Sequence, residues 1–198
     1  MQELNFPINF TFKISTLAND FTAVDAAGHT IAYVRQKMFK LKEDIRIYSD
    51  DTKTEEIFQI KADRWLDFSA AYAITDAAGN SIGKIARKGW ASLWKAHYEL
   101  IDQNDELQYN IREENAWIKV MDGMLGEIPI LGMFTGYLFN PSYIVMNLQD
   151  EPIARLKKKP SFFGRKFEVT ALTQFDADDD RRIVLGLMMM VLLERRRG

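Results

Sequence analysis

The chain has 198 residues, of which 47% are hydrophobic and 27% are charged, a composition typical of a folded globular protein and unlike that of a disordered chain. Its 26 basic and 28 acidic side chains give a net charge of -2, so the whole protein has little attraction for nucleic acid, and any electrostatic function must be local. The absence of cysteine excludes disulfides, thiolate metal sites and cysteine nucleophiles. The first residues, MQELN, do not have the pattern of a secretory signal, and we therefore expect a cytoplasmic protein.

The predicted elements begin with a strand over residues 8–14, in which apolar and polar residues alternate. Residues 21–31, FTAVDAAGHTI, then predict a β-hairpin, because an apolar strand led by an aromatic residue meets a turn rich in Asp and Gly. A third strand over residues 41–48 and a fourth over residues 56–60 complete this unit.

The same unit recurs twice along the chain. Residues 72–82, YAITDAAGNSI, repeat the hairpin, and strands over residues 93–101 and 107–111 follow it. Residues 143–153, YIVMNLQDEPI, are a weaker third copy, and a strand over residues 167–173 follows, with a helix in place of the fourth strand. We expect the N-terminal strand to fill the resulting gap, which gives a mainly β fold, a closed antiparallel barrel of about twelve strands without exposed edges.

An apolar segment over residues 121–139 lies between the second and third copies. Gly123, Gly126 and Pro129 interrupt it, and an unpaired membrane-spanning helix would not readily carry these residues. We interpret the segment as a connection packed over a barrel mouth; a flap that touches a membrane or covers a ligand is the alternative.

Residues 183–193, IVLGLMMMVLL, predict a helix that is apolar on every side and that must lie in a core or in lipid. Eleven residues span only about 16 Å as a helix, against about 30 Å of bilayer hydrocarbon, so we expect the helix to be buried inside the barrel rather than to cross a membrane. The aspartates 178–180 before it and the arginines 195–197 after it complement the helix dipole. Gly186 is expected where a strand passes close to the helix.

Three basic segments, residues 35–42, 84–95 and 155–166, follow equivalent strands of the three copies, so they share one rim of the predicted barrel. They hold fourteen of the 26 basic residues and no acidic residue. The residues predicted to bind an anionic ligand are Arg35, Lys37, Lys40, Lys84, Arg87, Lys88, Lys157, Lys158, Lys159, Arg165 and Lys166. The aromatic residues of the same segments are Phe39, Trp90, Trp94, Phe162 and Phe163. The acidic residues predicted at the opposite rim include Asp50, Asp51, Asp102, Asp105, Asp176 and Asp178.

Aromatic residues beside lysine and arginine suit an anionic lipid surface or headgroup. The predicted partner of this rim is therefore an anionic membrane lipid, with a protein partner as the other possibility. The alternative interpretation is a set of solvated hairpin loops whose aromatic residues seal the end of the barrel.

Asp176, Asp178 and Asp180 have the spacing that begins a calcium-binding loop. Arg181 stands where that loop needs glycine and Leu187 where it needs a bidentate glutamate, so we interpret the aspartates as helix-capping residues. No metal site is predicted.

No arrangement of catalytic residues is evident either. The two histidines, His29 in a predicted turn and His97 in a predicted strand, have no second histidine or cysteine at a metal-ligand spacing. There is no glycine-rich phosphate loop and no Ser-His-acid pattern, so we expect neither a cofactor nor enzymatic activity. An overall pI near 5.8 and the absence of a nucleic-acid motif argue against nucleic acid as a partner.

The repeated strand-Asp-Ala-Ala-Gly-strand unit, residues 140–145 (NPSYIV), residues 159–167 (KPSFFGRKF) and the ending over residues 178–193 resemble the LURP-one-related proteins of the tubby C-terminal-like superfamily. That superfamily also includes the phospholipid scramblases. The resemblance covers nearly the whole chain, and we expect residues 1–198 to form one domain. It implies a twelve-stranded closed barrel around a central helix, and it favours a protein that is not an enzyme, because most members of the family are not enzymes.

The resemblance also implies that tubby-like phosphoinositide binding or scramblase-like contact with membranes and calcium is worth testing, but it assigns no ligand residue to this chain. The leading hypothesis is a non-enzymatic barrel that binds anionic phospholipid or phosphoinositide through the basic aromatic rim, at the periphery of a membrane. The alternative is a protein-interaction or signalling scaffold with no lipid role. A hydrolase or transferase whose site is assembled from distant residues is a third hypothesis, which a deep polar pocket would favour.

Overall fold

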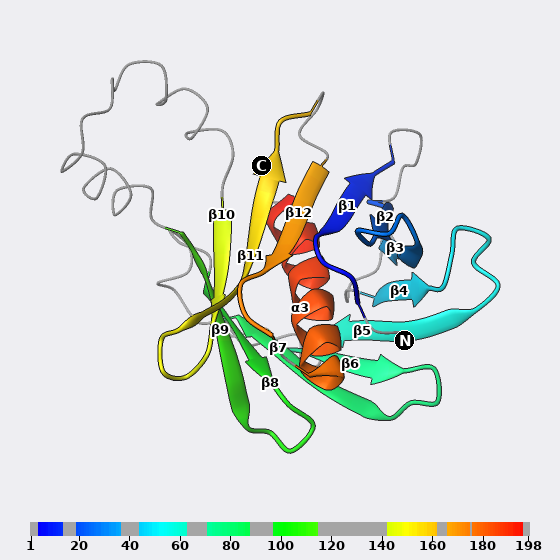
Figure 1. The fold of residues 1–198 in the computed structure, drawn as a ribbon. Helices are drawn as coiled ribbons and strands as arrows, with labels where there is room; N and C mark the ends of the chain where they lie inside the picture. Colours follow the sequence, from blue (N-terminus) through cyan, green and yellow to red (C-terminus); the bar gives the residue numbers. More distant parts are fainter. Residues whose placement is uncertain are drawn as a thin grey trace, which may run out of the picture.

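The computed structural model describes residues 4–13, 19–36, 44–62, 71–87, 97–114, 142–161, 166–174 and 176–195. This part of the chain forms a closed barrel of twelve strands around one helix (Figure 1). The elements are β1 (Ile8–Phe12), β2 (Phe21–Val24), β3 (Thr30–Gln36), β4 (Asp44–Tyr48), β5 (Glu56–Ala62), β6 (Ala71–Asp76), β7 (Ser81–Arg87), β8 (His97–Ile101), β9 (Leu107–Glu113), β10 (Ser142–Met146), β11 (Pro152–Lys159), β12 (Lys166–Ala171) and α3 (Ala177–Arg195).

All neighbouring strands are antiparallel, and each pairs with the strands that precede and follow it in the chain. The barrel closes where β1 pairs with both β12 and β2, with Phe10 opposite Phe167 on one side and opposite Ala23 on the other. The first unit is therefore β2–β5, the second is β6–β9, and the third consists of β10–β12 with β1. This confirms the prediction that the N-terminal strand fills the gap in the third copy.

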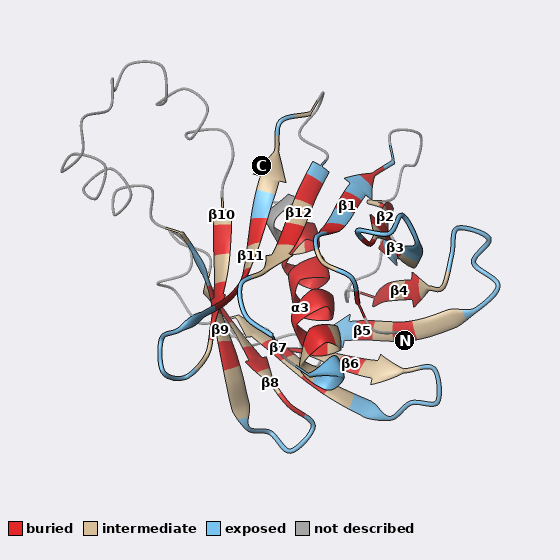
Figure 2. Ribbon diagram, viewed as in Figure 1, coloured by how far each residue is buried: buried red, intermediate tan, exposed pale blue. Residues whose placement is uncertain are grey.

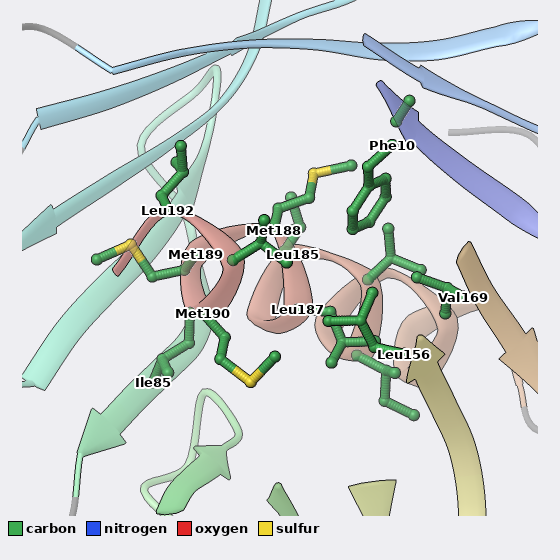
Figure 3. Packing of buried hydrophobic residues seen from close by; sticks show 14 of the residues in the cluster. Phe10, Ile85, Leu156, Val169, Leu185, Leu187, Met188, Met189, Met190 and Leu192 are labelled. Carbon is green, nitrogen blue, oxygen red and sulfur yellow. The ribbon is translucent and has the colours of Figure 1, made fainter. Parts of the chain in front are cut away.

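The apolar part of the helix is buried on every side. From Ile183 to Leu192 its apolar side chains are 0–1% exposed, because the inward-facing residues of the strands surround them (Figure 2). Phe10, Ile85, Leu156 and Val169 reach the helix from four different strands (Figure 3). The predicted burial of the helix within the barrel is confirmed. Within the described residues, no helix has both the length and the apolarity that crossing a bilayer requires.

Gly186 lies against β8, as the prediction of a close strand required. A Cβ atom at this position would lie 2.5 Å from Cδ2 of Leu100. The neighbour is thus a strand side chain rather than the strand backbone. The absence of a side chain at residue 186 leaves room for Leu100, which is itself fully buried.

The predicted start of the helix was wrong by six residues. The helix begins at Ala177, so aspartates 178–180 lie in its first turn instead of before it. A carboxylate oxygen of Asp176 accepts hydrogen bonds from the backbone N–H groups of Asp178 (3.0 Å) and Asp179 (2.9 Å). These bonds satisfy N–H groups that have no partner within the helix, which confirms the capping interpretation of Asp176.

The strand boundaries also differ in places from those predicted. The strand predicted over residues 8–14 ends at Phe12, and the one predicted over residues 56–60 continues to Ala62. The described parts of the strands predicted to begin at residues 41 and 93 start at Asp44 and His97. The segment over residues 121–139 lies outside the described residues.

Five hairpins share one turn. In each, the backbone N–H of the fourth turn residue donates to the carbonyl of the first, at 3.0–3.4 Å, and the fourth residue has a positive φ. Each hairpin also has a register shift where the strand enters the turn. The first and fourth residues of the five turns are Asp25 and Gly28, Asp50 and Lys53, Asp76 and Gly79, Asp102 and Asp105, and Asn147 and Asp150.

Arg182 fastens the start of the helix to the barrel wall. Its guanidinium donates to Asp179 Oδ1 (2.6 Å), Gln103 Oε1 (3.2 Å) and the carbonyl of Ile82 (3.3 Å). The second carboxylate oxygen of Asp179 accepts a hydrogen bond from the hydroxyl of Tyr109 (2.7 Å). This polar network closes one end of the otherwise apolar interior.

Candidate functional site

The two ends of the barrel are chemically different. At one end, here called the turn end, lie the five shared turns and the start of α3. The other end, the loop end, is where β1, β3, β5, β7, β9 and β11 end. The helix runs from the turn end to the loop end through the interior (Figure 1).

The acidic residues predicted at one rim do lie together. Asp50, Asp51, Asp102 and Asp105 are in shared turns, and Asp176 and Asp178 are at the start of the helix, so all six are at the turn end. The structure therefore confirms this half of the predicted charge separation.

Several carboxylates of the turn end are held in their ionised form. The pKa of Asp76 is lowered by hydrogen bonds from the Asn80 side chain and from backbone N–H groups, including those of Asn80 and Ala78. The backbone N–H of Glu106 is the main cause of the lowered pKa of Asp102. These carboxylates are engaged in closing turns, and this structural role accounts for them without a ligand.

Four of the predicted anion-binding residues point outward near the loop end. Arg35 is in β3, Lys157 and Lys159 are in β11, and Lys166 begins β12. They alternate with inward-facing core residues such as Leu156, which fixes the side of the wall that they face. Lys157, Lys159 and Lys166 lie on neighbouring strands and form one cluster, whereas Arg35 is separated from them by β1 and β2.

Arg87 and Lys158 occupy inward-facing positions instead. Arg87 pairs in register with Tyr98, and Lys158 pairs with Phe167; both partners belong to the buried core. The helix ends at this mouth of the barrel, where its last carbonyls carry a partial negative charge. Arg87 and Lys158 therefore lie on the inner side of the wall at this mouth and not on the outward basic surface.

Lys84 is not in a loop. It lies within β7, faces outward and makes an ion pair with Asp105 in a shared turn, with 2.7 Å between Nζ and Oδ1. Its position in the strand brings it to the turn end rather than to the basic rim, because β7 begins at that end.

The remaining members of the predicted site lie outside the described residues. These are Lys37, Lys40, Lys88 and Arg165, together with the aromatic residues Phe39, Trp90, Trp94, Phe162 and Phe163.

A second group of side chains on the outer wall was not predicted. Tyr33 faces outward from β3 but is only 2% exposed, and the ammonium groups of Lys13 and Lys53 lie 4.7 and 5.5 Å from the centre of its ring. Its hydroxyl donates to Asp20 (2.7 Å), and Lys13 also pairs with Asp51 (3.1 Å). Burial and the bond to Asp20 raise the pKa of Tyr33, so its hydroxyl remains a hydrogen-bond donor.

The alternation of Lys13 with buried Phe10 and Phe12 could have placed Lys13 on the outer wall from sequence. Its contact with Asp51, 38 residues away, depends on the stagger of the strands.

The histidines and carboxylates form no metal centre in the described part of the chain, where no three of them are close enough to hold an ion. His29 is in a turn, with Nδ1 3.5 Å from Asp25 Oδ2, and His97 is on a strand, with Nε2 3.5 Å from Asn110.

A model of a protein family matches most of the chain. The family described as LURP-one-related matches residues 30–191, which is most of the chain. No curated protein and no solved structure matches the chain significantly.

Proposed function

The chain belongs to the LURP-one-related family, and from this premise we propose that it is a non-enzymatic, tubby-like barrel that binds anionic phospholipid or phosphoinositide at its loop end. In this proposal the protein is cytoplasmic and associates peripherally with a membrane. The observation that supports it is the separation of charge between the two ends, with the outward cations Arg35, Lys157, Lys159 and Lys166 near the loop end and the turn aspartates at the other.

The filled interior limits where a ligand could bind. The helix side chains and the inward strand residues around them are almost completely buried, so the described core offers no room for a lipid tail or a small molecule. The ends and the outer wall remain. A basic surface there gains about 1 kcal/mol per lysine or arginine near an anionic membrane, so four such residues can act together.

Cosedimentation with phosphatidylcholine vesicles that contain phosphatidylserine or a phosphoinositide tests this proposal. We expect binding at low salt that weakens as the salt concentration rises, because the exposed charges are screened. The variant R35Q/K157Q should bind more weakly, by about fivefold for each residue. The matched control is K53Q/R181Q, which removes two cations from the turn end and should bind like the wild type. Absence of binding at low salt, or equal losses in the two variants, would refute the proposal.

A protein-interaction role is the second candidate. Leu148 and Leu172 are the exposed large apolar side chains of the described chain, at 54% and 39%, and both lie at the turn end. A protein partner of this surface would cover both leucines, since contiguous exposed apolar patches rimmed by polar residues mark protein contacts. If no anionic vesicle binds, this surface becomes the leading candidate.

A further inference from the structure

Two lysines of the loop end face each other directly. Lys159 of β11 and Lys166 of β12 are register partners on the outer face of the wall. Directly opposite residues of an antiparallel pair have Cβ atoms only about 5 Å apart, and like charges in such a pair are destabilising. The positions therefore have an electrostatic cost that the fold itself does not require.

The surroundings do not fully offset this charge. Glu168 pairs with Lys159 at 2.7 Å. It is also the register partner of Lys157, but its ion pair is with Lys159. Within the described residues, neither Lys157 nor Lys166 has an acidic group at ion-pair distance. On the other side of Lys166, the register partner is Thr11 of β1, whose exposed hydroxyl can donate a hydrogen bond.

We infer that the cluster formed by Lys157, Lys159, Lys166 and Thr11 binds a phosphomonoester. Three ammonium groups and one carboxylate leave a net charge of two, and a phosphomonoester at neutral pH carries a charge of about -1.5 to -2. A phosphodiester headgroup carries only one negative charge, so it matches the cluster less well. The ammonium groups of Lys159 and Lys166 close on the same phosphate, and the threonine hydroxyl donates to one of its oxygens.

This inference rests on the proposed function, since it names the headgroup chemistry that the loop end selects. The rest of the rim attracts any anionic surface, whereas the lysine cluster distinguishes a monoester from a diester. The same chemistry could come from a lipid headgroup or from a small soluble phosphate.

The test compares two kinds of phosphatidylcholine vesicle adjusted to equal surface charge, one with phosphatidic acid and one with phosphatidylserine. We expect wild-type protein to bind the phosphatidic acid vesicles about fivefold more tightly, as one additional ion pair contributes. K159Q/K166Q should bind both vesicles equally. The matched control is K61Q/R112Q, which removes two exposed outward cations from β5 and β9 and should keep the preference.

The outcomes separate this inference from the proposed function. Binding to both vesicles without a preference, or the same preference in K159Q/K166Q as in wild type, overturns the phosphomonoester site and leaves general lipid binding intact. If no vesicle binds but calorimetry with glycerol 3-phosphate gives a signal that K159Q/K166Q abolishes, the site is supported and the lipid proposal fails.

The melting temperature gives an independent check. Without anions, K166Q should melt at a higher temperature than wild type because repulsion is relieved, and a lower melting temperature would remove the premise.

Discussion

At the scale of single residues, the shared turn requires a positive φ at its fourth position. Gly28 and Gly79 meet this requirement with φ values of 85° and 87°, whereas Lys53, Asp105 and Asp150 adopt φ values of 59–66° with a side chain present. Only glycine enters this region without a steric cost. The repeated sequence DAAG is thus explained by the conformation of the turn and does not indicate a binding motif.

Substitutions at the fourth turn position should therefore have opposite effects. Gly79→Ala should destabilise the protein by about 1 kcal/mol, although nothing lies within 4 Å of the added Cβ, because the backbone conformation alone is unfavourable. Asp150→Gly should stabilise it by about 0.5 kcal/mol. Urea denaturation measures both. Ala78→Gly, one residue away and without a positive φ, is the control and should only destabilise.

The first turn position predicts how stability depends on pH. Hydrogen bonds lower the pKa values of three of these aspartates. The main donor is the Thr52 hydroxyl for Asp50, the Asn80 side chain for Asp76 and the backbone N–H of Glu106 for Asp102. Because these values are lower in the folded than in the unfolded state, the stabilisation is complete above the ordinary pKa of aspartate. It is lost as the pH falls below about 4 and through the lowered folded values.

The shared turn of the third repeat, which begins at Asn147, shows which substitution to test. Asn147 accepts the same backbone hydrogen bonds as the aspartates, without a titrating group. We expect Asp76→Asn to keep the fold and to reduce the loss of stability between pH 5 and about pH 3. Denaturation midpoints across that range measure it. A pH profile identical to that of the wild type would show that Asp76 does not contribute.

At the scale of elements, the helix is positioned by different forces at its start and along its length. Along its length it is held by apolar contacts, which are not directional. At its start, Arg182 bonds to β7, to the turn after β8 and to Asp179. These directional bonds set the depth and rotation of the helix, which places Gly186 against Leu100.

Removing Arg182 should therefore cost more than removing its neighbour. Arg182→Met leaves Asp179 and the carbonyl of Ile82 without their charged donor and should destabilise the protein by about 2–3 kcal/mol. Arg181→Met removes an ion pair to the largely exposed Asp178, which should cost less than about 1 kcal/mol. Thermal denaturation of the two variants compares a buried and an exposed arginine on the same helical turn. Equal losses would contradict the role assigned to the network.

Gly186 gives a second test of the same element. Gly186→Ala should destabilise the protein by about 1–3 kcal/mol, because the added methyl group overlaps Leu100 in a packed core. The double variant G186A/L100V should recover part of this loss, since the smaller valine gives back space at the contact. Additive losses in the double-variant cycle, measured by urea denaturation, would show that the two residues do not interact.

At the scale of the whole molecule, the repeat and the alternation of apolar residues are enough to predict twelve strands, their order and the buried helix. The alternation also predicts which residues of a basic segment face outward. Because side chains alternate along a strand, Lys157 and Lys159 can be assigned to one face and Lys158 to the other from sequence alone.

What sequence does not provide is the stagger between distant strands. The bond between Tyr109 and Asp179 joins residues 70 positions apart, and the ion pair of Lys13 with Asp51 links one end of β1 to a turn beyond β4. Such contacts depend on the tilt of the strands in the closed barrel. Lys84 reaches the turn end because β7 begins there, which its position in a basic segment of the sequence did not indicate.

The wall and the helix depend on each other, and the magnitude of this dependence can be estimated. Nine apolar side chains of the helix, from Ile183 to Leu192, are buried, and at about 1.5–3 kcal/mol each they contribute roughly 14–27 kcal/mol. The net stability of a domain is only about 5–15 kcal/mol. A chain that ends at Asp176 should therefore lack cooperative unfolding and a dispersed NMR spectrum, whereas removal of residues 196–198 alone should preserve both. Leu185→Lys tests the same dependence at full length, because it places a charge against the inward faces of the strands. If either the truncated chain or the lysine variant kept a cooperative thermal transition, the strands would be able to hold the barrel without the helix.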